Sequence, residues 1–225
     1  MKEYFEELDR NISSALSPVV KYLFYVCIAV FLVTMFAPRT VFTWLAARPA
    51  TTLLGGQVWQ LLTYAFVHAN FPHLFFNLLS IYFFGVRLEQ RWGSETFFRF
   101  VVAVAAGAVA THLAVALIVG QPDISIVGIS GVVYGVLFAY AYYYPEDTIF
   151  LYFMLPMKVK YFVAILGLFT LMASAGSGGG GVAHLTHLGG LMTGFLFVRA
   201  PGTFAWIPVP PVFRRGATWG REYWR

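Results

Sequence analysis

Long apolar stretches, separated by shorter polar or charged segments, make up most of this 225-residue chain. An α-helix rises 1.5 Å per residue, so about 20 apolar residues are needed to cross the roughly 30 Å hydrocarbon core of a bilayer. The pattern predicts six membrane-spanning helices, at residues 19–37, 71–88, 97–119, 127–144, 159–176 and 182–199. We therefore expect an all-α, polytopic membrane protein in which six transmembrane helices form one bundle.

Two stretches between the expected spans are too interrupted to cross a bilayer. Residues 38–70 contain tryptophans, arginines and prolines, so we expect a large external loop that lies in the membrane interface. Residues 145–160 carry acids, proline and two lysines, so we expect a turn in the cytoplasmic interface. The predicted organisation is a cytoplasmic N-terminal segment at residues 1–18, a six-helix domain at 19–200, and a basic cytoplasmic tail at 201–225.

The composition excludes a soluble domain. Hydrophobic residues make up 59% of the chain and charged residues only 11%, whereas soluble domains carry about 25% charged residues. The single cysteine, Cys27, excludes an internal disulfide and is expected to pack as a small apolar residue.

The distribution of Lys and Arg predicts the orientation. With the N-terminus inside, the cytoplasmic segments hold 13 of the 15 Lys and Arg residues, and only Arg39 and Arg48 are external. Cytoplasmic segments of membrane proteins are enriched in these residues. Both termini are therefore expected in the cytoplasm, and the net charge of +5 indicates membrane orientation rather than binding to nucleic acid.

Polar side chains recur near the outer end of three predicted helices. Ser130 and His187 lie near the starts of the fourth and sixth helices, which run in the same direction, so both are expected at the same shallow depth. A neutral imidazole can accept the proton of a serine hydroxyl near pH 7, which makes His187 a candidate base and Ser130 a candidate nucleophile. His73 and Asn77 share one face of the second helix and, with the backbone N–H of Ser130, are candidate donors to an oxyanion. Tyr134, one turn after Ser130, is placed to orient the imidazole by stacking.

The same features also allow a structural interpretation. Small residues let membrane helices pack closely, and glycines flank the serine and follow the histidine, at Gly128, Gly131, Gly190 and Gly194. Histidines within membrane helices instead favour a functional interpretation, because placing a polar ring in hydrocarbon costs free energy. For the three other histidines we expect structural, hydrogen-bonded roles, at His68, His112 and His184.

Several motifs, in order and spacing, resemble the rhomboid family of intramembrane serine proteases, over nearly the whole chain from residue 59 onward. GISG resembles the family's GxSG motif, which implies that Ser130 is the nucleophile. HLGGLMTG resembles HxxGxxxG, which implies that His187 rather than His184 is the base, because only His187 has glycines at both offsets. HANFPHLFFN resembles HxxxxHxxxN, which implies oxyanion roles for His73 and Asn77 and a structural role for His68.

Other parts of the chain add to this resemblance or depart from it. Glu89, Arg91 and Gly93 resemble the family's ExRxGS element, which implies a tie between the second and third helices on the inner side. Gln60 departs from the Trp-Arg pair of some bacterial members, which leaves the contacts that stabilise the external loop open. The glycine-rich loop at residues 175–181 resembles, in its position, the family's mobile cap, and Tyr134 stands where the family stacks a tyrosine on the catalytic histidine.

The resemblance implies a serine endopeptidase that cuts peptide bonds in or near transmembrane helices through a covalent acyl-enzyme, without metal or organic cofactor. The expected partners are transmembrane proteins with unstable helices and membrane lipid, and the expected location is a bacterial inner membrane. One alternative is a rhomboid-like protein that binds membrane clients without cutting them, which predicts loss of Ser130 or His187. The other alternative is a transporter, which predicts ionisable groups throughout the membrane depth. This chain has no acidic residue in the middle of a predicted span.

Overall fold

Helices form most of the described structure. The structure is a computed structural model that describes residues 16–151, 154–174 and 179–214. Most of the expected N-terminal segment, residues 175–178 of the glycine-rich loop and residues 215–225 of the expected tail lie outside the described residues.

Each predicted span contains a helix. The helices are α2 (Pro18–Phe36), α5 (Phe71–Ser80) continued through the π-helical turn η3 (Ile81–Gly85) into α6 (Val86–Trp92), α7 (Ser94–Ile118), α8 (Ser130–Tyr143), α9 (Val159–Ser174) and α10 (Gly179–Arg199). Within the described residues, four helical stretches are long and apolar enough to cross a bilayer: α2, α5 to α6, α7 and α10. The apolar helices α8 and α9 are shorter, with 14 and 16 residues. The prediction of an all-α polytopic membrane protein is confirmed.

Helix α8 begins three residues later than the sequence pattern predicts. Gly128 has a φ of +100°, outside the helical region, so the helix cannot include it and starts at Ser130. Pro145 follows the end of the helix, as expected for a residue that restricts the one before it. The late start leaves Ser130 in the first turn of α8.

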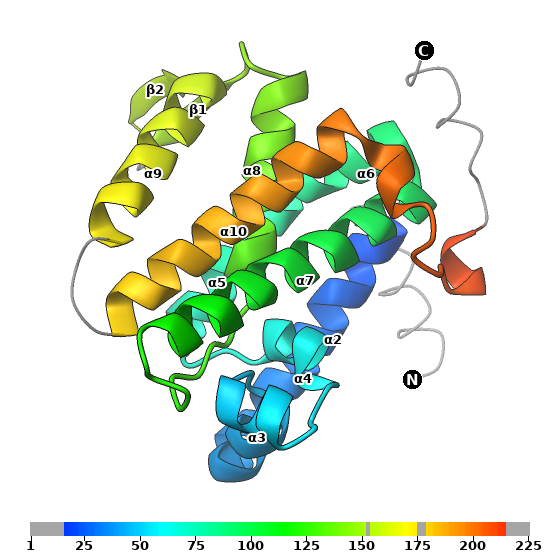
Figure 1. The fold of residues 1–225 in the computed structure, drawn as a ribbon. Coiled ribbons are helices and arrows are strands. Elements are labelled where there is room, and N and C mark those ends of the chain that lie inside the picture. Colours follow the sequence, from blue (N-terminus) through cyan, green and yellow to red (C-terminus); the bar gives the residue numbers. More distant parts are fainter. Residues whose placement is uncertain (1–15, 152–153, 175–178, 215–225) are drawn as a thin grey trace.

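Helix α10 lies in the middle of the bundle. It packs along α7 and α8 and also contacts α9, so three helices surround it (Figure 1). Aromatic side chains fill the bundle near the C-terminal end of α10, where Phe197 packs edge-on against Phe100 with ring centroids 5.2 Å apart. This central position lets α10 face residues from several other helices at once.

The segment before α5 forms short helices, α3 (Pro38–Leu45), η1 (Ala50–Leu54), α4 (Gln60–Thr63) and η2 (Tyr64–Phe66). Gln60 is completely buried among them. Its Oε1 accepts hydrogen bonds from the hydroxyls of Thr51 (2.8 Å) and Thr52 (2.7 Å). Its Nε2 donates to the carbonyl of Thr43 (3.1 Å) and to Gln57 Oε1 (2.7 Å). Gln60 thus makes the contacts that the sequence left open for this loop.

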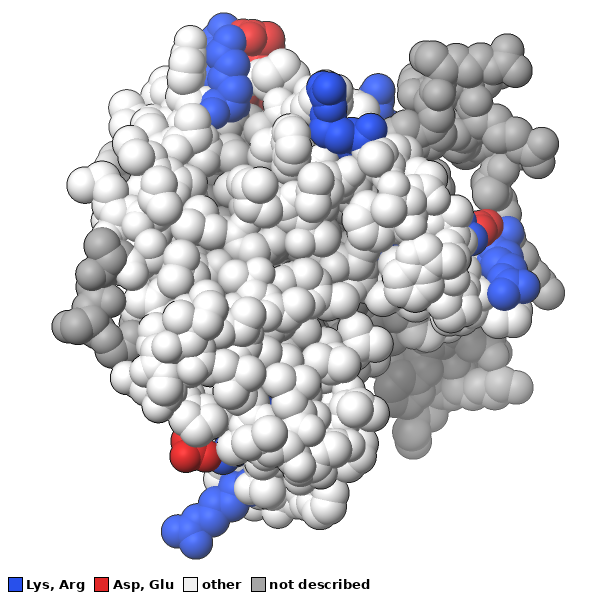
Figure 2. All heavy atoms as spheres, in the orientation of Figure 1, with Lys and Arg blue, Asp and Glu red and all other residues white. Residues whose placement is uncertain are grey.

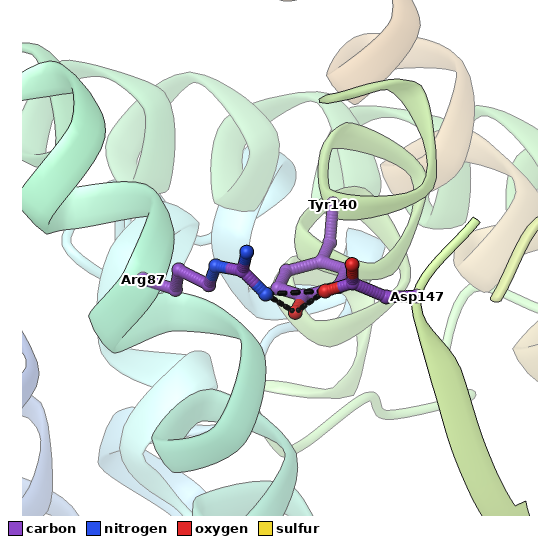
Figure 3. Close-up of polar contacts among 3 residues, drawn as sticks. All are labelled: Arg87, Tyr140 and Asp147. Atoms are coloured by element: carbon purple, nitrogen blue, oxygen red, sulfur yellow. Dashed lines mark hydrogen bonds and ion pairs between the residues drawn. The ribbon is translucent and has the colours of Figure 1, made fainter. Parts of the chain in front are cut away.

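Residues 145–160 contain a β-hairpin where the sequence predicted only a turn. Strands β1 (Thr148–Leu151) and β2 (Leu155–Lys158) pair antiparallel, with Thr148 opposite Lys158. At the base of the hairpin, Tyr140 donates to Asp147 Oδ2 at 2.7 Å, and Arg87 donates to Tyr140 at 2.7 Å and pairs with Asp147 (Figure 3). This cluster joins α6, the last turns of α8 and the residue before β1.

Glu89 connects the starts of two helices to α6. Its carboxylate is buried and accepts hydrogen bonds from Val19 N (2.8 Å), Val20 N (3.0 Å) and the hydroxyl of Ser94 (2.6 Å). A carboxylate at a helix N-terminus satisfies backbone N–H groups that have no partner within the helix. The expected tie to α7 is therefore present, and the same residue also caps α2, which the sequence did not reveal.

Charged side chains lie near the margins of the visible face. Figure 2 shows a broad uncharged surface with Lys, Arg, Asp and Glu gathered around its edges. Large apolar residues are exposed on the helices, for example Phe36, Phe76, Ile118 and Phe169. Such a surface is stable in contact with lipid rather than water.

Candidate active site

Glycines bring α8 and α10 into backbone contact. A Cβ built on Gly190 would lie 2.1 Å from the carbonyl oxygen of Gly131, and one built on Gly194 would lie 2.8 Å from the Cα of Gly135. No side chain larger than hydrogen fits at either position without moving the helices. The close helix packing that the small residues predicted is therefore confirmed, and it fixes the start of α8 against the middle of α10.

This contact places a serine hydroxyl against an imidazole. Ser130 Oγ lies 2.8 Å from His187 Nε2, within hydrogen-bond distance, although 57 residues separate them in the sequence. Both residues are half-buried. When Nδ1 carries the ring proton, Nε2 can accept the serine proton, so the geometry suits proton transfer between the two side chains.

Tyr134 fixes the plane of the imidazole. Its ring stacks on His187 with centroids 4.5 Å apart and an angle of 9° between the planes. Its hydroxyl is hydrogen-bonded to Thr170 Oγ1 of α9 at 3.0 Å. The position of the tyrosine ring is therefore fixed both by this hydrogen bond and by the stacking on His187. His187 Nδ1 is buried and has no hydrogen-bond partner among the described residues. Stacking and helix packing therefore orient this imidazole without a carboxylate.

His73 and Asn77 face Gly128, which lies two residues before the start of α8. A Cβ on Gly128 would lie 2.7 Å from His73 Nε2 and 3.7 Å from Asn77 Nδ2. Asn77 Nδ2 is buried and donates no hydrogen bond within the part of the chain described. Asn70 caps α5 by accepting from His73 N at 2.9 Å. The absence of a side chain at Gly128 thus lets two N–H donors approach the backbone next to Ser130.

His68 packs against the ring of His73. It is completely buried, its Nδ1 lies 3.2 Å from the carbonyl of Phe66, and its ring packs edge-on against His73 at 5.1 Å. Burial, with a smaller contribution from charge on His73, lowers the pKa of His68 to about 4. His68 is therefore neutral at pH 7, as a packing and positioning residue requires.

The two remaining histidines behave differently from each other. His112 is hydrogen-bonded as predicted, with Nε2 3.0 Å from the carbonyl of Ile124 and Nδ1 3.4 Å from Thr186 Oγ1. It thereby connects α7 to the loop that leads to α8 and to α10. His184 packs edge-on near His187 at 6.3 Å, but no described residue is hydrogen-bonded to its buried Nδ1, so the described residues do not supply the partner predicted for this atom.

Sequence reasoning missed two polar partners of the site. Thr170, which holds Tyr134, is a single threonine within an apolar run, and Thr186, which contacts His112, stands between His184 and His187. A polar residue in the middle of a membrane helix was the available signal. Within the described residues, no three His, Cys, Asp or Glu side chains are grouped so as to hold a metal ion.

Comparison with known proteins places this arrangement in a family. A family model described as the Rhomboid domain matches residues 55–201, which include every residue of the site. The chain belongs to the rhomboid family. Three similar relatives are the proteins named Rhomboid protease GlpG from Salmonella paratyphi A (strain ATCC 9150 / SARB42), Salmonella typhi and Salmonella newport (strain SL254). Each is 33% identical over 78 residues, which is 34% of this chain and 28% of the relative.

These matches cover a limited part of the named relatives. The aligned stretch spans only 28% of their length, whereas the rhomboid domain match extends over most of this chain. The membrane location follows from the rhomboid domain together with the apolar helices.

Proposed function

We propose that this rhomboid is an intramembrane serine endopeptidase in which Ser130 is the nucleophile and His187 the general base. The observation that carries the proposal is the 2.8 Å distance between Ser130 Oγ and His187 Nε2 across two packed helices. The name of the GlpG relatives supports the class of reaction. The proposed catalytic domain is residues 19–200, flanked by a cytoplasmic segment at 1–18 and a basic tail at 201–225.

In the first half-reaction, His187 Nε2 accepts the hydroxyl proton while Ser130 Oγ attacks the carbonyl carbon of the scissile bond. The carbonyl π electrons move to oxygen and form an oxyanion. When the carbonyl re-forms, the C–N bond breaks and the proton on His187 passes to the leaving amine. Water then attacks the acyl-enzyme with His187 again as base, which releases the acid and restores the serine.

His73, Asn77 and the Ser130 backbone N–H are the proposed oxyanion donors. Asn77 Nδ2 is buried and donates to no other described atom, so it is ready to donate to a developing negative charge. A donor of this kind contributes about 3 kcal/mol to transition-state stabilisation. Gly128 is proposed to keep the approach open, since a side chain there would collide with His73.

The proposed substrates are transmembrane proteins with locally unstable helices. A helix hides its carbonyl groups in hydrogen bonds from residue i to i+4, so an intact substrate helix offers no carbon for attack. Residues that break helices expose the scissile bond and allow it to reach Ser130.

The proposed orientation places the site near the external face of a bacterial inner membrane, with both termini cytoplasmic. The bias of Lys and Arg to the proposed inner segments, 13 against two, supports this orientation. Water needed for the second half-reaction can reach a site at this shallow depth.

The experiment is cleavage of a transmembrane reporter by the purified protein in liposomes. We expect cleavage by the wild type and none by Ser130→Ala or His187→Ala at unchanged expression. Unaltered cleavage by either variant would refute the proposed catalytic pair. Binding of the reporter by the wild type without any cleavage would instead favour the alternative of a rhomboid-like client-binding protein.

A further inference from the structure

The proposed reaction places a positive charge on His187 each time its Nε2 accepts a proton from Ser130 or from water. A Ser-His-Asp triad stabilises this charge with a carboxylate beside the second ring nitrogen. His187 Nδ1 is buried, and no described residue is hydrogen-bonded to it. The carboxylates whose contacts the structure describes pair with other groups, at Glu89, Glu95, Glu146 and Asp147. Another kind of neighbour therefore has to stabilise the imidazolium.

The face of the Tyr134 ring is a neighbour that fits this task. Its centroid lies 4.5 Å from that of His187, and the two ring planes are 9° apart. An aromatic face carries partial negative charge and attracts a cation within about 6 Å of its centroid, more strongly where water is excluded. The neutral imidazole gains much less from this attraction than the imidazolium does. The stack therefore favours the charged state that forms during the reaction.

A hydrogen bond to Thr170 sets the direction of the Tyr134 phenol proton. Thr170 Oγ1 donates its only proton to the carbonyl of Leu166 at 2.7 Å. The same oxygen lies 3.0 Å from the Tyr134 hydroxyl, so Thr170 accepts here and the phenol donates. A phenol that donates its proton gains electron density on its oxygen and on its ring. This hydrogen bond therefore makes the ring face a better partner for a cation.

Thr170 differs from its neighbours on α9. Three residues of this helix are buried, Val159, Val163 and Thr170, and only the threonine among them is polar. A threonine in a membrane helix often bonds to the carbonyl four residues before it, as Thr34 of α2 does at 2.7 Å. That bond alone would satisfy the hydroxyl proton of Thr170. Its oxygen in addition accepts a proton from an aromatic ring of the candidate site.

We propose that Thr170 is a positioning residue of the proposed reaction, and that it holds Tyr134 so that the ring face stabilises the positive charge on His187. Thr170 acts through Tyr134 and touches neither the substrate nor the reacting atoms. The inference rests on the proposed function, because the charge appears only if His187 accepts a proton. It gives the task of the triad carboxylate to a neutral pair of side chains, one tyrosine and one threonine.

The test is steady-state cleavage of the transmembrane reporter by the purified full chain in liposomes. Thr170→Val keeps a side chain of similar shape but removes the acceptor, and it should lower kcat about tenfold with little change in KM. Thr170→Ser keeps the hydroxyl and should restore most of kcat. Tyr134→Phe keeps the stack but removes the phenol, so it should lower kcat about as much as Thr170→Val. The double variant should lose no more than either single variant, because both remove the same hydrogen bond.

Thr34→Val is the matched control, because it removes a hydroxyl that bonds to the carbonyl of Val30 within its own helix. It should cut like the wild type. A wild-type kcat in folded Thr170→Val or in Tyr134→Phe overturns the inference, and so do additive losses or a Thr170→Ser variant as slow as Thr170→Val. If Thr170→Val fails to fold, Tyr134→Phe decides. A wild type that cuts no reporter would instead refute the proposed function, and the inference with it.

Discussion

Replacing Gly190 with alanine adds one methyl group where the backbones of α8 and α10 touch. The new Cβ would lie 2.1 Å from the carbonyl oxygen of Gly131 and 2.8 Å from its carbonyl carbon. Both are backbone atoms, so no change of rotamer relieves the overlap. Ordinary contact begins near 3.4 Å, so the helices must separate by about 1.3 Å at this point.

That separation is large compared with the tolerance of the site. Ser130 adjoins Gly131 and His187 lies one turn from Gly190, so the 2.8 Å distance between Oγ and Nε2 would increase towards 4 Å. A misplacement of about 1 Å lowers the rate about 100-fold, and overpacking a rigid interior costs about 1–3 kcal/mol of unfolding free energy. We therefore expect Gly190→Ala to lower the cleavage rate about 100-fold and to lower Tm.

The assay is the initial rate of reporter cleavage in liposomes, with thermal unfolding in detergent measured beside it. Gly167→Ala on α9 is the matched control, because its Cβ would lie 3.6 Å from Leu191 Cδ1, an ordinary contact. This control should keep the wild-type rate and Tm. A Gly190→Ala variant that cuts at the wild-type rate would show that close helix contact does not set the geometry of the site.

Three further predictions concern residues around the site. His73→Ala and Asn77→Ala should each lower kcat about 100-fold or more with little change in KM, and steady-state kinetics in which only KM changes would contradict their oxyanion role. Gln60→Leu removes the acceptor of the Thr51 hydroxyl and of the buried Thr52 hydroxyl and should lower the unfolding free energy by about 1–3 kcal/mol, which a Tm equal to that of the wild type would disprove. Because burial lowers the pKa of His68 to about 4, the unfolded chain takes up its proton first as pH falls. The stability that this residue contributes is therefore lost as the pH falls from about 6.5 to 4. His68→Asn should make Tm depend less on pH over that range. A variant whose Tm falls with pH as steeply as that of the wild type would show that His68 is not the cause of the pH dependence.

Hydrophobic length and motif spacing were enough to predict the helices and the meeting of Ser130 with His187. A run of about 20 apolar residues has few alternatives to a membrane helix, because every backbone polar group must be satisfied within it. Helices that run in the same direction place their starts at one level, and this rule brings Ser130 to His187. Gly128 fixed the true start of α8 through its positive φ, which a hydrophobicity pattern does not record.

Contacts made by single polar side chains could not be predicted in the same way. Gln60 is hydrogen-bonded to five residues spread over one loop, and the sequence around Gln60 does not indicate their positions. Glu89 was expected to tie α6 to α7, but its role as the cap of α2 depends on a helix 70 residues away in the sequence. The hairpin formed by β1 and β2 was not predicted because its four-residue strands, TIFL and LPMK, lack the alternation of apolar and polar residues that indicates a strand.

The central claim is that Ser130 is activated by His187, and covalent labelling tests it most directly. A fluorophosphonate reacts with an activated serine by forming an O–P bond and releasing fluoride, and peptide mass spectrometry identifies the modified residue. The account predicts a single adduct on Ser130 in the wild type and none in the folded His187→Ala variant. An adduct on another residue, or equal labelling of Ser130 without His187, would contradict it.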